Sequence, residues 1–221
     1  MFGSGSPARG CRFACRIGQT LSESSMALKT CGLRRAVCAD LLAVLSLVAV
    51  CACRRSSRGD LAEGQAPASM TISSASFGNG DPIPQKLSCD GIGLSPDIQL
   101  PAPPPGTKSF LLVMDDTDAG GFVHWLLYNI PPDTRDIPEG ASSRGALPAG
   151  AAEGENSLRK TGYFGPCPPP PTPHHYVFRM YALDANLDLP AGEEKRQLAA
   201  VARGHILAEG IMTGLYTRAV K

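Results

Sequence analysis

Two apolar stretches separated by an acidic turn form the clearest pattern in this 221-residue chain. Residues 110–114 are a continuous apolar run, short enough to predict a strand that is buried on both faces. Residues 122–130 are rich in aromatic and β-branched side chains and predict a second strand. If the two strands pair, the carboxylates of Asp116 and Asp118 lie at one end of a sheet, with His124 beside them. The pattern therefore predicts a small polar site at that end.

Both faces of the second strand are apolar, which places this strand inside the sheet. Alternation along a strand predicts one face made of Phe122, His124, Leu126 and Tyr128, and an opposite face made of Val123, Trp125 and Leu127. His124 is then expected to be buried, and a buried imidazole needs a hydrogen-bond partner.

The remaining pattern predicts a mainly β domain with a short helix near its C-terminus. Glycine (24 residues) and proline (20 residues) cluster in loops, which favours many short strands. Residues 193–202 are predicted to form the helix, with Leu198 and Val201 facing inward. Further strands are predicted at residues 70–75, 84–88 and 175–184, with Tyr176, Phe178 and Met180 sharing one face, and residues 211–217 are a last strand or an irregular end.

A long stretch with little periodicity, residues 131–173, lies between the predicted strands. We expect it to be irregular apart from a short strand near Ser157, and a connection of this length is usually functional or mobile. It contains four consecutive prolines at residues 168–171, which fix an extended backbone that has no donors. Such a segment can border a pocket, or it is a surface linker.

Composition narrows the class of function. Hydrophobic residues make up 43% of the chain and the formal net charge is +1, so neither disorder nor a polyanionic partner is indicated. The globular part has no basic stripe of the kind that nucleic acid requires, so we expect no nucleic-acid partner. Once the N-terminal segment is set aside, about 150 residues remain, which suits one domain with a core.

The N-terminal segment, residues 1–53, has the pattern of an extension followed by an export signal. Met26 is a candidate start, and positive residues then precede an apolar run at 36–52 that only Asp40 interrupts. The run ends like a bacterial lipobox, with Cys53 as the lipidated residue; an ordinary signal peptide and an uncleaved anchor are the alternatives. We expect a protein of the cell envelope that contacts a membrane only through this anchor.

Beyond Cys53, the small polar residues 54–69 are predicted to be a tether, and residues 70–221 the folded domain. Six of the eight cysteines lie at or before Cys53, which leaves Cys89 and Cys167 in the domain. An exported domain with two cysteines permits one disulfide, and two unpaired cysteines are the alternative.

Four short motifs in this order resemble the phosphatidylethanolamine-binding protein family, and in particular its bacterial Raf-kinase-inhibitor-like branch. They are Asp-Thr-Asp-Ala-Gly at 116–120, His-Trp at 124–125, Gly-Pro-Cys-Pro-Pro at 165–169 and His-His-Tyr at 174–176. The resemblance covers roughly residues 70–221, the whole predicted domain. It implies a large antiparallel sheet packed on a smaller one.

The resemblance also implies a small pocket for phosphate-like anions at the rim of the sheet. By position, the pocket would be lined by Asp116, Asp118, His124 and His174, with Tyr163, Gly165, Pro166 and Pro168 to one side. If the histidines are protonated, they and the backbone amides of glycine-rich loops can supply donors, and binding would strengthen as the pH falls.

Three positions depart from the pattern of the family. The acidic motif of the family has prolines where this chain has Thr117 and Gly120, so we expect a less stiff turn. His175 stands at a usual arginine and Leu100 at a usual tryptophan. We expect these changes to affect ligand affinity and identity more than the fold.

The resemblance favours a non-enzymatic binding protein without a cofactor, whose partner is a small anionic or phospho-ligand such as a phospholipid head group. The alternatives are an inhibitor of an envelope protease or another protein target, a general base formed by an Asp–His pair, and a metal site at the same residues. A fourth alternative is that these side chains only hold loops together through hydrogen bonds. We expect neither catalytic residues nor a bound metal.

Overall fold

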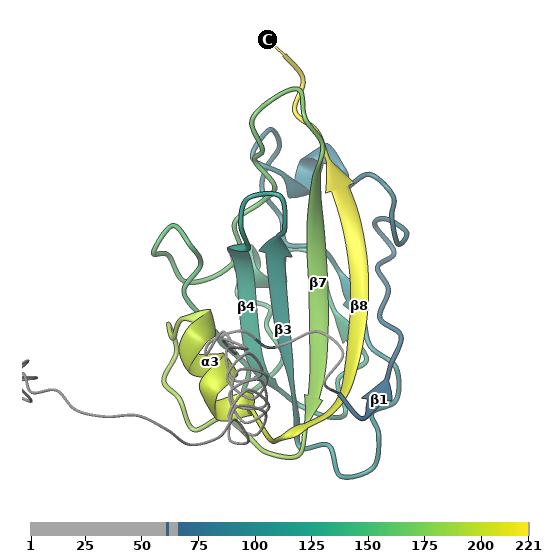
Figure 1. Ribbon diagram of the computed structural model, residues 1–221, viewed down its shortest axis with the longest axis vertical. Helices are drawn as coiled ribbons and strands as arrows, with labels where there is room; N and C mark the ends of the chain where they lie inside the picture. The colour runs from purple at the N-terminus through teal and green to yellow at the C-terminus, as the bar shows by residue number, and fades with distance from the viewer. Residues whose placement is uncertain (1–60, 62–65, 221) are drawn as a thin grey trace, which may run out of the picture. The chain divides into compact units, whose positions relative to one another are not determined.

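A computed structural model describes Leu61 and residues 66–220 (Figure 1). The predicted extension and export signal at 1–53, including Cys53, lie outside the described residues. Within the described part of the chain, no helix has the length and apolar character that a bilayer crossing requires.

The described residues form a six-stranded sheet and a two-stranded sheet. The main sheet has the order β1-β8-β7-β3-β4-β6, and all neighbours are antiparallel except the parallel pair β1 and β8. Its strands are β1 (Ala68–Ser69), β3 (Ser109–Asp116), β4 (Phe122–Ile130), β6 (Ala152–Glu153), β7 (His174–Leu183) and β8 (Ile206–Tyr216). The small sheet pairs β2 (Ile98–Gln99) with β5 (Asp136–Ile137). The helices are η2 (Gln85–Leu87), α2 (Ala141–Arg144) and α3 (Lys195–Ala202).

The main sheet buries apolar side chains on both faces. On one face Trp125, Phe178 and Met180 pack in a cluster that includes Ile98 and Ile137 of the small sheet. On the other face, Leu111 and Tyr181 pack with residues of α3, which lies over this face in Figure 1. The expected architecture, mainly β with a large sheet, a smaller sheet and a helix near the C-terminus, is confirmed.

A β-bulge changes the faces that strict alternation predicts for β4. Met114 of β3 pairs with Trp125, but the next residue, Asp115, pairs with Val123, so His124 is the extra residue. The buried residues that pack with Leu198 and Ala202 of α3 are called the α3-side cluster. Val123 consequently packs in this cluster with Leu126 and Tyr128, rather than with Trp125 and Leu127 as predicted.

Two predicted strands near the start of the domain are wrong. Within residues 70–75, only Ser73 makes a β-bridge, because the buried carboxylate of Asp97 binds the amides of Ala75 and Ser76. Residues 84–88 instead form the 3₁₀-helix η2, where the amide of Leu87 donates to the carbonyl of Pro84 at 2.9 Å.

The other element boundaries differ less from the predictions. The helix begins at Lys195, and its buried face is made of Leu198, Ala199 and Ala202, whereas Val201 is 40% exposed and does not face inward. β8 begins five residues before the predicted start, and β6 takes the place of the strand expected near Ser157. Ala68 and Ser69, at the end of the predicted tether, pair with β8 as β1.

Candidate functional site

The carboxylate of Asp116 and the imidazole of His174 form a buried pair where β3 ends and β7 begins. Asp116 is 3% exposed and His174 8% exposed, and Oδ2 of Asp116 lies 2.8 Å from Nδ1 of His174. Because a carboxylate only accepts hydrogen bonds, Nδ1 carries the proton, and Nε2 has no partner among the described residues. We call this end of the main sheet the site end.

The second oxygen of Asp116 organises the acidic turn. Oδ1 accepts the amides of Asp118 and Ala119, both at 3.0 Å. The turn then passes through Gly120 and Gly121, whose φ angles of 68° and 78° lie in the left-handed region. A proline cannot adopt the φ of Gly120, so the turn in this chain excludes the proline that the resembling motif carries at this position.

Asp118 and His175 form a second pair that is exposed. One carboxylate oxygen of Asp118 accepts the amide of His175 at 2.6 Å and lies 2.9 Å from its Nδ1. The side chains are 41% and 54% exposed. The hydrogen bond from the amide of His175, followed by that from its side chain, lowers the pKa of Asp118.

His124 is 3% exposed and is held by the loop after residue 160. Its Nδ1 lies 2.7 Å from the carbonyl oxygen of Phe164, and the two rings stack with centroids 5.5 Å apart. The carbonyl requires a proton on Nδ1, so Nε2 of the neutral ring is an acceptor that no described residue binds. Burial lowers the pKa of His124, while the charge of Asp116 acts in the opposite direction.

Tyr176 completes the inner part of the site, although the sequence analysis did not select it. Its ring is fully buried and lies edge-on to His124 at 5.1 Å. Its hydroxyl makes no hydrogen bond of good geometry, although Asp116 and the backbone of Cys167 lie near it, and burial followed by the charge of Asp116 raises its pKa. Tyr176 pairs directly with Asp116 across the strands, so alternation could have placed both on one face.

The predicted wall of the pocket is fixed to the loop around η2. The Tyr163 hydroxyl donates to the carbonyl of Leu87 at 2.8 Å, so it holds the wall rather than pointing a donor at Asp116. Gly165 packs so closely that a Cβ atom there would lie 2.6 Å from the same carbonyl. The carbonyl of Pro166 accepts the amide of Cys89 at 3.1 Å, and Pro168 is buried beyond it.

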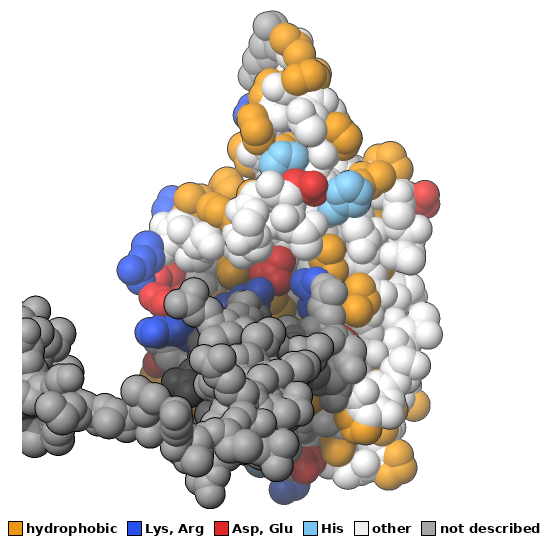
Figure 2. Space-filling view, viewed as in Figure 1, with side chains coloured by type: hydrophobic (Ala, Val, Ile, Leu, Met, Phe, Trp, Pro, Cys, Tyr) orange, Lys and Arg blue, Asp and Glu red, His pale blue; other side chains and the backbone are white. Residues whose placement is uncertain are grey.

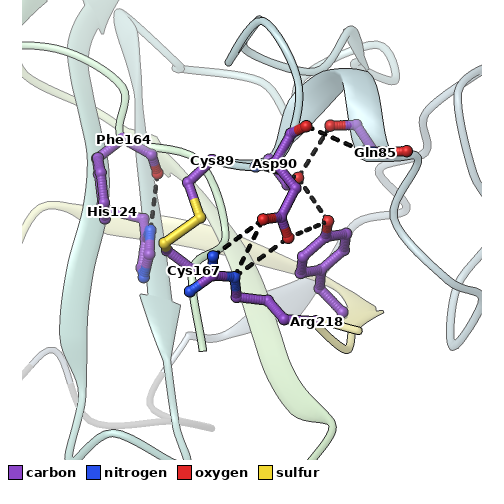
Figure 3. Close-up of a disulfide and its surroundings, with 9 residues drawn as sticks. Gln85, Cys89, Asp90, His124, Phe164, Cys167 and Arg218 are labelled. Atoms are coloured by element: carbon purple, nitrogen blue, oxygen red, sulfur yellow. Dashed lines mark hydrogen bonds and ion pairs between the residues drawn. A yellow bond between two sulfur atoms is a disulfide. The ribbon is translucent and has the colours of Figure 1, made fainter. Parts of the chain in front are cut away.

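A disulfide joins Cys89 to Cys167, with an S–S distance of 2.05 Å, and lies between two groups of polar residues (Figure 3). His124 and Phe164 are on one side. On the other side, Arg218 donates to both carboxylate oxygens of Asp90 at 3.0–3.2 Å, and the Tyr216 hydroxyl donates to Asp90 at 3.0 Å. The sequence pattern gave no sign of this second group, whose members are far apart in the chain.

Two cavities formed by the described residues lie beside the predicted site residues. A cavity of about 610 Å³ is lined by residues that include Asp90, Tyr216 and Arg218, beyond the disulfide from His124. Another of about 350 Å³ lies near the start of α3. Four predicted residues nevertheless gather at the site end: Asp116, Asp118, His124 and His174.

The acidic and histidine side chains at the site end are arranged in pairs rather than in larger clusters. Among Leu61 and residues 66–220, no group of three or more His, Cys, Asp or Glu side chains has the arrangement that could hold a metal ion. Asp115 precedes Asp116 but faces away from the site, where it pairs with Arg179 at 3.2 Å and Lys195 at 2.7 Å.

Curated relatives match most of the described domain. A UPF0098 protein of Pyrococcus horikoshii is 38% identical over 165 residues, which cover 72% of this chain and 82% of the relative. The Mycobacterium tuberculosis protein LppC, whose name describes a candidate lipoprotein, is 38% identical over 152 residues, or 66% of this chain and 73% of the relative.

Solved structures with the same fold include two proteins whose titles name the family. A phosphatidylethanolamine-binding protein homologue of Chlamydia trachomatis is 35% identical, with a TM-score of 0.63 over 68% of this chain and 99% of its own. Escherichia coli YbcL, described as a member of the mammalian family, is 27% identical, with a TM-score of 0.64 over 69% and 100%. The family model for phosphatidylethanolamine-binding proteins matches residues 73–217, and this chain belongs to that family.

Proposed function

We propose that this protein is a non-enzymatic binding protein whose site end takes the phosphate-like group of a small anionic ligand, either a phospholipid head group or a soluble phospho-ligand. The observation that carries the proposal is the hydroxyl of Tyr176, which is buried beside the Asp116–His174 pair and makes no hydrogen bond of good geometry to the protein. An unsatisfied buried polar group costs roughly 1–3 kcal/mol, and a ligand oxygen that accepts from this hydroxyl would remove the cost.

The histidines supply further contacts whose character depends on protonation. Nε2 of His124 and of His174 has no partner among the described residues, because each ring uses Nδ1 for the protein. In the neutral ring Nε2 accepts, and in the imidazolium it donates. An anion therefore binds best to the protonated rings, so binding should take up protons and strengthen as the pH falls.

The arrangement of nucleophiles supports binding rather than catalysis. No hydroxyl or thiol among the described residues is hydrogen-bonded to His124 or His174, as a nucleophile that these rings activate would be. Cys89 and Cys167 are joined to each other. The Ser88 hydroxyl is engaged by Tyr216 at 2.7 Å.

Export and lipid anchoring are part of the same proposal. The sequence before residue 54 supports it, together with the relative LppC. Growth with a radioactive fatty acid should label the wild-type chain, and Cys53→Ala should remove the label. A labelled Cys53→Ala variant would contradict lipidation at this residue.

The binding site is tested with the full chain in detergent. Calorimetric titration with phosphorylethanolamine, phosphate and acetate is compared between wild type, Tyr176→Phe and His205→Ala. His205 pairs with Asp184 at 2.7 Å and belongs to neither pair at the site end, so it is a matched histidine control. Tyr176→Phe should bind phospho-ligands roughly tenfold more weakly, the equivalent of one lost hydrogen bond, without losing stability.

The possible results distinguish a role of the Tyr176 hydroxyl in binding from a different function and from a general effect on the fold. Equal affinity of wild type and Tyr176→Phe would contradict the assignment of the hydroxyl. No binding of any ligand by wild type would overturn the proposed function and favour a protein target. Equal weakening in Tyr176→Phe and His205→Ala would show a general effect on the fold.

A further inference from the structure

The two most exposed large apolar side chains of the described residues are each two residues away in the sequence from a member of the polar group beyond the disulfide, Asp90 or Arg218. Ile92 is 75% exposed and Val220 71% exposed, against 40–47% for Leu158, Val201 and Ile211. A single exposed apolar residue needs no explanation, but a group around a polar centre marks an interaction surface.

Covalent and polar links hold these residues at the site end. Ile92 follows Asp90 by two residues, Val220 follows Arg218 by two, and Asp90 and Arg218 are hydrogen-bonded. The disulfide then ties the same loop to Cys167, after which Pro169, Pro170 and Pro171 are exposed. Figure 2 shows hydrophobic side chains around the histidines at this end.

The loop presents Ile92 in a fixed position. The amide of Gly91 donates to the carbonyl of Ser88 at 3.1 Å, and a Cβ atom at Gly91 would lie 2.2 Å from the carbonyl oxygen of Gln85. The Gln85 side chain in turn donates to the carbonyl of Asp90 at 3.0 Å. These contacts fix the backbone of the loop immediately before Ile92.

We infer that the site end docks on a phospholipid bilayer, with Ile92, Val220 and the exposed prolines entering the head-group layer around the anion site. The inference rests on the proposed function and adds the source of the ligand, the lipid surface. It departs from the expectation that the protein contacts a membrane only through its N-terminal anchor. Ile92 and Val220 would reach the boundary between the head groups and the acyl chains, and the anion site would lie at the level of the lipid phosphates.

The charges at this end permit such an approach. Arg218 neutralises Asp90, and His175 partners Asp118, so the carboxylates that face outward have cationic or titratable partners. Inside the site, Asp116 has His174, and His124 and Tyr176 carry no negative charge. No unpaired carboxylate among these residues would repel a layer of phosphates.

The tether is long enough for the anchoring membrane to be the target. β1 pairs at Ala208, and the site end of β8 is Tyr216, eight residues or roughly 27 Å further along the strand. From Cys53 to Leu61, which packs against the α3-side cluster, eight residues span up to about 28 Å. If Cys53 carries the lipid, the tether is about as long as β8 between β1 and the site end, which is compatible with a site end that faces the anchoring bilayer.

The test is amide hydrogen exchange of the full chain on vesicles of phosphatidylethanolamine and phosphatidylglycerol, compared with the full chain in detergent. Docking should slow exchange in peptides that cover residues 89–94 and 217–220 roughly tenfold, while the amides of α3 exchange as before. The proline run has no amides and is silent. The double variant Ile92→Asp/Val220→Asp should lose the protection, and Val201→Asp/Ile211→Asp, which charges exposed apolar residues elsewhere, should keep it.

A soluble arm separates the two sources of the ligand. Glycerophosphoethanolamine added in detergent should fill the anion site without protecting residues 217–220. Equal protection by this soluble head group would overturn docking and leave the proposed function in place. Unchanged exchange on vesicles, with calorimetric binding of phosphorylethanolamine intact, would also overturn docking alone. Loss of both signals would overturn the proposed function as well.

Discussion

The two Asp–His pairs at the site end have the same chemistry and opposite surroundings. Asp116 and His174 are buried, and Asp116 also binds two amides of the turn. Asp118 and His175 occupy neighbouring positions, but their side chains are 41% and 54% exposed. A buried pair that loses one partner leaves an uncompensated polar group, whereas water replaces the partner of an exposed one. The inner pair should therefore decide stability and binding, and the outer pair should adjust them.

Removal of the inner carboxylate should have the largest effect. Asp116→Ala should lower the free energy of unfolding by about 3 kcal/mol, because it leaves the buried His174 and two amides of the turn without their acceptor. Urea denaturation checks this, with the exposed-pair variant Asp118→Ala alongside. Equal losses in the two variants would remove the distinction between the pairs.

A proline at Gly120 should come next. The φ of 68° at this residue is closed to proline, so Gly120→Pro should destabilise the protein by more than about 1 kcal/mol and weaken phosphate binding. Thermal unfolding and calorimetry measure the two effects. Gly120→Ala keeps the amide and should cost less. A Gly120→Pro variant as stable as wild type would show that the turn also accepts the conformation typical of the family.

Acidification should change the free energy of unfolding by less than these substitutions, because His124 is buried. Burial lowers its pKa below the ordinary 6.5, so between these two values the unfolded chain binds a proton that the folded chain does not. The free energy of unfolding should therefore decrease as the pH falls below about 6.5. His124→Gln should have a shallower pH dependence over this window, measured by urea denaturation. Parallel curves for the two proteins would contradict the effect of burial.

The outer pair should give the smallest change. His175→Asn should lower the free energy of unfolding by less than about 0.5 kcal/mol, because exposed ion pairs contribute little. The far pair offers a control in His205→Asn, since the side chains of His205 and Asp184 are 47% and 46% exposed. A loss in His175→Asn as large as in Asp116→Ala would show that the two pairs act as one network.

Sequence patterns could predict the strands that carry the inner pair, but they could not predict the register in which the strands pair. The strands β3, β4 and β7 are long and strongly apolar, so their local sequence pattern and the tertiary packing favour the same structure. The bulge at His124 has no local signal, because it arises from pairing with β3. The start of β8 at Ile206 was missed because Ala208, Glu209 and Gly210 have no strand pattern.

The structure brings the predicted site residues together unequally, for a similar reason. Asp116, Asp118, His124 and His174 lie in motifs that resemble the family, and the structure gathers them. Tyr163 lies in the same region, but its hydroxyl is used by Leu87, which only the folded arrangement reveals. That the Tyr176 hydroxyl lacks a hydrogen bond of good geometry is likewise a property of the packed core and not of the sequence.

The disulfide makes the structure of the site depend on the redox environment in which the chain folds. Cys89 and Cys167 are 78 residues apart in the sequence, and they connect the wall beside His124 to the loop that carries Asp90. Such a bond forms and persists in oxidising compartments and is rare where thiols are kept reduced. A copy that stayed in a reducing compartment would have every residue of the site but not the cross-link that joins its wall to the opposite loop. If the protein is exported as we propose, the cross-link between the wall and the loop forms only after export.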